Sequence, residues 1–355
     1  MTESRFNQWL GLVLILCFFA ASTGVRCATK DASPDSEIRH LHFPPNVSLG
    51  PLLILKPQRD DPNSWEQMFD PGKTVGGARG DVTVTIPSHN LLILDANGRV
   101  FEKPALLKMV SPFGIDVLRI RFYSLADSED HLLDGTFDYV NHLEGLQMLD
   151  VDSSDISDAN LSKLKGMSHL RTISCYNTTI SGDCFKDLAT LPALTELLAP
   201  DCLIKESNLK NLQKFPRLSI LDLAGDGRTP HSPANHLTQR GVQEIAKCHG
   251  IVNLNVRDQI HFDDSCLKYL ATMKNLRYLY LTGTPITFNG LSALRGLGLK
   301  YLALPSTCYK NSAEVARMFP HALCKIAQPS SPQTSRLNID DPKDRDLKVL
   351  FSPLR

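Results

Sequence analysis

The feature that most constrains the fold of this chain is an internal repeat of about 24 residues. An apolar pattern of the form Leu-x-x-Leu-x-Leu returns seven times, and its first four starts are each 24 residues apart. The starts are Leu146, Leu170, Leu194, Leu218, Ile251, Leu276 and Leu299. A more divergent unit begins at Val117. A fixed period of this length indicates an architecture of stacked structural repeats.

Each repeat combines two different apolar periods. Leu149 and Val151 alternate with polar residues, which predicts one apolar face of a short strand. Leu161, Leu164 and Met167 follow at the spacing of one helical face. A residue whose side chain can cap a helix precedes the helical half, namely Ser157, Ser181, Thr238, Asp263 or Thr287. Each unit is therefore predicted to be a strand followed by a helix.

One such unit cannot bury its own apolar face, but stacked units can. The sequence predicts an α/β fold, a right-handed solenoid of about eight strand–helix repeats over residues 116–327, with strands on the concave side. Small side chains at the turn after each strand are expected to bond neighbouring backbone. They are Ser154, Thr178, Cys202 and Thr284.

These repeats resemble the leucine-rich repeat family. The residues before them are similar to the leader of secreted planctomycete-type leucine-rich repeat proteins. They include His42-Phe-Pro-Pro, Ser48-Leu-Gly-Pro-Leu, Trp65 and Ala78-Arg-Gly-Asp-Val-Thr-Val. The resemblance implies an exported repeat protein with a small β-rich capping segment over 42–115, and it supplies no catalytic residues.

The N-terminus has the layout of a secretory signal. An apolar run from Trp9 to Ala21 follows Arg5 and is followed by small residues, which predicts a signal peptide over 1–28. The alternative is an uncleaved anchor, although the run is shorter than the roughly 20 residues that a membrane span needs. We expect export to the periplasm, the cell envelope or the extracellular space. Residues 29–41 are predicted to be a linker, and 328–355 a disordered tail.

The cysteines give no sign of a redox or metal motif. Cys17 and Cys27 lie in the signal region, and the other seven form an odd number with no C-x-x-C spacing. They are Cys175, Cys184, Cys202, Cys248, Cys266, Cys308 and Cys324. We expect them to be buried free thiols.

Composition and motifs argue against several function classes. The chain has 38 basic and 38 acidic residues, whereas nucleic-acid binders usually carry a basic excess. Gly72-Lys73-Thr74 lacks the glycine that a phosphate loop needs at position 67. Arg79-Gly80-Asp81 is interpreted as a turn into a strand. The histidines form no metal motif, and no nucleophile stands with its base. The sequence therefore predicts no catalysis, cofactor or metal.

The concave strand positions are the candidate binding residues. Strand alternation predicts that they are exposed, acidic in the early strands and aromatic and basic in the late ones. The candidates are Arg257, Tyr278, Tyr280, Tyr301, Tyr176 and Asp222. Tyrosine and arginine are enriched in binding hot spots. The alternative is a solvated strand face whose tyrosines brace one another.

The predicted function is a non-catalytic, exported scaffold that binds a protein, or a glycan, on its concave face. A structural role in a cell-envelope layer is the alternative. A third possibility is an adaptor like those F-box ubiquitin-ligase proteins that carry leucine-rich repeats, which would need a helical F-box before the repeats.

Overall fold

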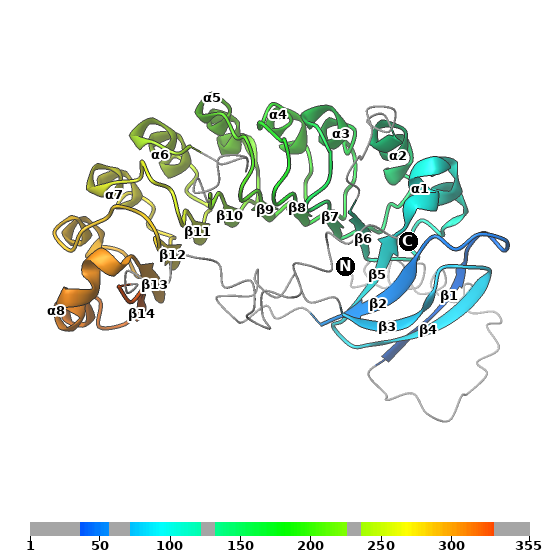
Figure 1. Ribbon diagram of the computed structural model, residues 1–355, viewed down its shortest axis with the longest axis horizontal. Helices are drawn as coiled ribbons and strands as arrows, with labels where there is room; N and C mark the ends of the chain where they lie inside the picture. The colour runs from blue at the N-terminus through cyan, green and yellow to red at the C-terminus, as the bar shows by residue number, and fades with distance from the viewer. Residues whose placement is uncertain (1–35, 57–71, 122–131, 226–235, 330–355) are drawn as a thin grey trace, which may run out of the picture.

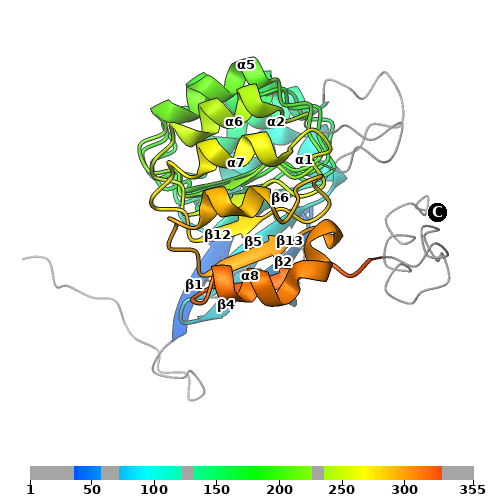
Figure 2. The same cartoon turned by 90° about the vertical axis from the view of Figure 1, so that its left-hand side faces the viewer.

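The computed structural model describes residues 36–56, 72–121, 132–225 and 236–329. They form an arch, with strands along its inner side and helices along its outer side (Figure 1). The strands described belong to one twelve-stranded sheet and one two-stranded pair. Seen from the C-terminal end, the helices lie over one another in a single outer layer (Figure 2).

Ten neighbouring strands in the described part of the sheet run parallel, in chain order. They are β5 (Leu91–Ala96), β6 (Val117–Ile120), β7 (Met148–Asp150), β8 (Thr172–Ser174), β9 (Glu196–Leu198), β10 (Ile220–Asp222), β11 (Asn253–Asn255), β12 (Tyr278–Tyr280), β13 (Tyr301–Leu304) and β14 (Leu323–Ile326). The stacked strand–helix order agrees with the leucine-rich repeat resemblance. β5 and β14 extend the array beyond the units that the sequence pattern identified.

The same backbone bond joins each unit to the one before it. The Arg171 backbone N donates to the Gln147 carbonyl at 2.8 Å, and the Thr195 N donates to the Arg171 carbonyl at 2.9 Å. The Ser219 N donates in turn to the Thr195 carbonyl at 2.9 Å. Neighbouring strands therefore keep one register, which places equivalent residues of successive repeats side by side.

Short helices connect the strands on the outer side. They are α1 (Gly98–Glu102), η2 (Pro104–Met109), α2 (Leu132–Val140), α3 (Asp158–Ser162), α4 (Phe185–Leu188), α5 (Glu206–Leu209), η4 (Lys210–Lys214), α6 (Gln239–Ala246), α7 (Asp264–Leu270), η5 (Gly290–Leu294), η6 (Ser306–Asn311) and α8 (Ser312–Met318). Three of the predicted capping residues, Ser157, Thr238 and Asp263, are N-caps.

The other two predicted caps are wrong. α4 begins after Cys184 and η5 begins after Asn289, so Ser181 and Thr287 lie outside these helices. Both bond back to the preceding unit instead: the Ser181 N donates to Asp158 at 2.8 Å, and the Thr287 N donates to Asp264 at 2.8 Å. A carboxylate in the first turn of the preceding helix holds each of these residues.

The main core is an apolar cluster that runs from Leu41 to Phe319 between strands and helices. The predicted turn bonds are confirmed: the Thr178 and Thr284 hydroxyls donate to the Cys175 and Leu281 carbonyls at 2.8 and 2.7 Å. Ser154 and Cys202 also bond to backbone, but they donate to carbonyls of the preceding unit, those of Ile120 and Cys175. The residue before each of these turn positions has a left-handed backbone, which short polar residues and glycine tolerate best. These residues are Ser153, Asn177, Asp201 and Gly283.

The N-terminal segment extends the sheet and adds a separate pair of strands. β2 (Pro51–Leu55) pairs antiparallel with β5 on one side and with β3 (Lys73–Gly77) on the other. β1 (Ser36–His42) pairs antiparallel with β4 (Asp81–Pro87). The prediction of a linker over 29–41 is therefore wrong from Ser36 onward, because this stretch gains a full ladder to β4.

The boundary expected at residue 115 does not divide the fold. β5 and α1 form a strand–helix unit ahead of it, and the apolar core passes through it. Arg39 of β1 also donates to both oxygens of buried Asp116, at 2.9 and 3.2 Å. The described residues before β5 form strands, so no helical F-box lies among them.

Some predicted segments lie outside the described residues. They are the signal region, Trp65, most of the insert between Ala224 and His236, and the tail from 330. Among the residues that the structure describes, no helix is long and apolar enough to span a membrane.

Candidate binding face

The inner face of the sheet presents two rows of side chains that cross successive strands. The register aligns the first residues of the strands in a leading row and the third residues in a trailing row, while the residues between them enter the core. At the C-terminal end the leading row contains Asn253, Tyr278, Tyr301 and Leu323. The trailing row there contains Asn255, Tyr280, Ala303 and Lys325.

The six predicted binding residues fall into separate places on this face. Tyr278, Tyr280 and Tyr301 form one cluster on β12 and β13. Asp222 lies in the trailing row on β10, and Arg257 follows β11 by two residues. Tyr176 follows β8, far along the arch from the tyrosine cluster (Figure 1).

The predicted exposure of three of these residues is wrong. Tyr280 is 2% exposed, Tyr301 is 4% exposed and Asp222 is 3% exposed. Neighbouring strands lie only about 4.8 Å apart, so large side chains on this face also pack against each other from one row to the other. The rings of Tyr280 and Tyr301 are tilted with their centroids 5.0 Å apart. Tyr278, Tyr176 and Arg257 are half-buried.

A buried charge network occupies the early part of the inner face. The Arg119 Nε donates to Asp150 at 2.8 Å, and both residues are buried in the trailing row. Arg121 lies 3.4 Å from the same carboxylate. Burial raises the pKa of Asp95, the next residue along this row, although the two arginines oppose the shift. These charges largely satisfy one another.

Asp152 continues this network toward β8. Its Oδ1 accepts from the Ser174 hydroxyl at 2.7 Å and from the Tyr176 backbone N at 2.8 Å. Burial, and then the negative charge of Asp150, raise the pKa of Asp152 to about 7. The acidic early strands that the sequence suggested as exposed are therefore buried and internally bonded.

Asp222 is held in a similar way in the middle of the arch. It accepts from the Asn255 side-chain amide at 2.9 Å and from the Ala224 backbone N at 2.9 Å. Burial raises the pKa of its carboxyl to about 6. Asp222 thus braces the strand ladder, and its oxygens face groups of the chain itself.

Residues that sequence reasoning missed complete the C-terminal end of this face. Leu323 and Lys325 on β14 are exposed, and the Lys325 Nζ lies 5.7 Å from the centroid of the Tyr301 ring. Leu323 is 59% exposed although it continues the row of Tyr278 and Tyr301. The signal for β14 was weak because its stretch lacks the Leu-x-x-Leu-x-Leu spacing.

The cysteine side chains of the repeats pack in the interior of the fold. The described cysteines are all free, and all but Cys324 are buried, as expected. Burial raises the pKa of Cys248 to about 12 and of Cys266 to about 11, so neither is a ready thiolate. No cluster of His, Cys, Asp and Glu in the described part of the chain could hold a metal ion.

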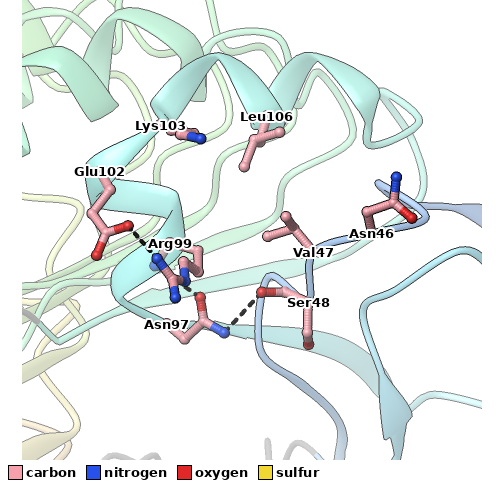
Figure 3. A pocket seen from close by; sticks show the side chains of 8 residues that line it. All are labelled: Asn46, Val47, Ser48, Asn97, Arg99, Glu102, Lys103 and Leu106. Carbon is pink, nitrogen blue, oxygen red and sulfur yellow. Dashed lines mark hydrogen bonds and ion pairs between the residues drawn. The ribbon is translucent and has the colours of Figure 1, made fainter.

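A pocket lies between the loop before β2 and the helix α1 (Figure 3). Several of its polar groups bond one another: the Asn97 amide donates to the Ser48 carbonyl at 2.9 Å, and Arg99 pairs with Glu102 at 2.7 Å. Asn97 also caps α1. The pocket therefore lies where the N-terminal segment bonds to the first strand–helix unit.

Comparison with known proteins gives a likeness in structure and none in sequence family. No family model matches the chain, and no curated protein matches it. Among solved structures, it is similar to an internalin from Listeria monocytogenes, with a TM-score of 0.35 and 14% sequence identity. The alignment covers 53% of this chain and 61% of the internalin chain.

Proposed function

We propose that this chain is a non-catalytic, protein-binding repeat scaffold that uses the inner face of its arch. The observation that carries the proposal is that alternate residues of the strands have different roles, one set in the core and the other on the inner face. Leu221 and Leu279, between the two rows, are fully buried in the core, whereas the rows themselves contribute almost nothing to it. A continuous face that the core does not require is free to vary for binding.

Within that face, the C-terminal end is the proposed contact region. Charges in the early strands are buried against one another, whereas Tyr278, Arg257, Leu323 and Lys325 reach the surface in whole or in part. We assign contact with the partner to these residues. Tyr280, Tyr301 and Asp222 support them from beneath, and Tyr176 belongs to a separate part of the face.

We also propose that the protein is exported, as a right-handed solenoid of the secreted leucine-rich repeat kind. The support is the apolar run from Trp9 to Ala21, with the small residues that follow it.

A site-specific photo-crosslinker tests the binding proposal directly. It is placed at Tyr278 in β12 or, as a matched control, at Tyr269 in α7 of the preceding unit. Both residues are half-buried tyrosines, but one lies on the inner side and the other on the outer side. Cells producing the full chain are irradiated, and adducts are identified by mass spectrometry.

We expect a discrete adduct with a second protein from position 278 and none from position 269. Equal adducts from both positions, or adducts from 269 alone, would contradict a partner on the inner face.

A further inference from the structure

A strip of apolar and aromatic side chains crosses the last three strands of the inner face. Tyr278, Tyr301 and Leu323 occupy aligned positions on β12, β13 and β14, and we call them the C-terminal strip. Tyr301 is buried beneath its neighbours, Tyr278 is half-buried, and Leu323 is largely exposed. A surface leucine beside two tyrosines is suited to accept an apolar side chain.

Lysines stand on both sides of this strip. Lys300 directly precedes Tyr301 at the edge where the strands begin, and its carbonyl accepts from the Leu323 backbone N at 2.8 Å. Lys325 lies in the trailing row, on the other side of Leu323. Both lysines are exposed. The strip is therefore bracketed by one cation at its leading side and one at its trailing side.

The last repeats are strongly basic as a whole, although the complete chain carries no net charge. From Ser265 to Pro329 there are eight lysines and arginines but one acidic residue, Glu314. Earlier carboxylates on the inner face, such as Asp222, are buried and bonded. A ligand approaching this end of the arch meets a positive field, which favours an anionic partner.

We propose that the C-terminal strip binds a short, extended peptide segment of a partner protein, in which an apolar side chain lies between carboxylates. The apolar residue would pack on Tyr278 and Leu323, and the carboxylates would pair with Lys300 and Lys325. The inference rests on the proposed function and names the chemistry of its partner.

The spacing of the two lysines sets the length of this segment. Lys325 is aligned with Ala303, three residues after Lys300, so the two lysine positions lie roughly 10 Å apart along the strand direction, on either side of the strip. An extended chain advances about 3.3 Å per residue, so about three or four residues that cross the strip reach from one lysine to the other. One apolar residue with an acidic residue on either side has this length.

The test selects ligands without assuming a partner. A library of random eight-residue peptides, displayed on phage, is selected on the full chain. The affinities of the selected peptides are then measured by fluorescence anisotropy. Enriched peptides are expected to carry Asp or Glu on both sides of an apolar residue, and to bind more weakly as salt concentration rises.

Charge variants locate the binding site. The double change Lys300→Glu and Lys325→Glu should weaken binding at least tenfold, and Lys300→Gln with Lys325→Gln should weaken it less. The control is Lys268→Glu with Lys310→Glu, two exposed lysines of α7 and η6 that give the same change in net charge. It should change affinity less than twofold. Melting curves confirm that each variant is folded.

The outcomes separate this proposal from the broader one. The proposed acidic-peptide site would be overturned if the Lys300/Lys325 and Lys268/Lys310 glutamate variants lost affinity equally, or if the selected peptides carried no acidic residues. If the selected peptides lack acidic residues, the proposed function still stands provided that Tyr278→Ser abolishes their binding. The proposed function fails as well if Tyr278→Ser and Leu323→Ser both leave binding unchanged. Tighter binding of a single-stranded oligonucleotide at the same lysines would overturn the peptide in favour of a nucleic acid.

Discussion

Replacing Asp152 by asparagine is expected to stabilise the protein near neutral pH and to remove part of its pH dependence. Both hydrogen bonds that the Asp152 carboxylate accepts, from Ser174 and from the Tyr176 backbone, end on the same oxygen. An asparagine carbonyl can accept both. Its amide then replaces the second carboxylate oxygen, so the repulsion from Asp150 disappears together with the cost of burying a charge.

The sign and size of the effect follow from the shift in the pKa of Asp152 on folding. In the folded protein burial raises the pKa of Asp152 from 3.8 to about 7, so folding favours the protonated carboxyl. The stabilising contribution is complete below the unfolded value and is lost as pH rises toward the folded one. Each pH unit in this window corresponds to about 1.4 kcal/mol. Between pH 5 and pH 7 the parent should therefore lose about 2 kcal/mol relative to Asp152→Asn.

Urea unfolding followed by circular dichroism at pH 5, 6 and 7 measures this difference. Other buried carboxyls, such as Asp222 with its pKa of about 6, are common to both proteins and cancel. The control is Asp138→Asn on α2, an exposed carboxylate paired with Lys163. A free-energy difference that stays constant across this pH range, or an Asp152→Asn protein less stable than the parent at pH 7, would refute the reasoning.

Two further predictions concern the core and the N-terminus. Leu221→Ala and Leu279→Ala should each lower the free energy of unfolding by about 2–5 kcal/mol, because each removes a fully buried side chain. The control Leu203→Ala, at a side chain that is 47% exposed, should lower it by under about 0.5 kcal/mol. Unfolding of either core variant at the free energy of the parent would contradict the register. The mature protein should begin between about Ser22 and Ala28, as mass spectrometry of the native chain can check, and an intact Met1 on cytosolic protein would argue against export.

The repeated leucines made most of the solenoid predictable from sequence. A period of 24 residues assigns Leu149, Ile173, Leu197 and Leu221 to one buried position, and the structure aligns them on four successive strands. β5 escaped the pattern because Leu91-Leu92-Ile93-Leu94 is a continuous apolar run, with Ile93 and Leu94 buried on opposite faces of the strand. Such a run lacks the alternation that identifies a repeat strand.

The candidate site was less predictable, because alternation indicates the face of a strand and not its exposure. Tyr280 and Tyr301 lie on the expected face, yet contact between neighbouring strands buries them. The Arg119–Asp150 pair shows what local patterns omit, since its partners are 31 residues apart in sequence. Opposite charges at equivalent positions of neighbouring repeats were the available signal.

The repeated backbone bond between units has a consequence for how this protein can evolve. Because the Arg171, Thr195 and Ser219 amides each bond the same position one unit earlier, a complete unit can in principle be duplicated or deleted without altering the joints on either side. Each such event would lengthen or shorten the inner face by about 4.8 Å, the spacing of one strand. The span of the inner face is thus a quantity that recombination can change in whole steps, while both ends of the arch stay as they are.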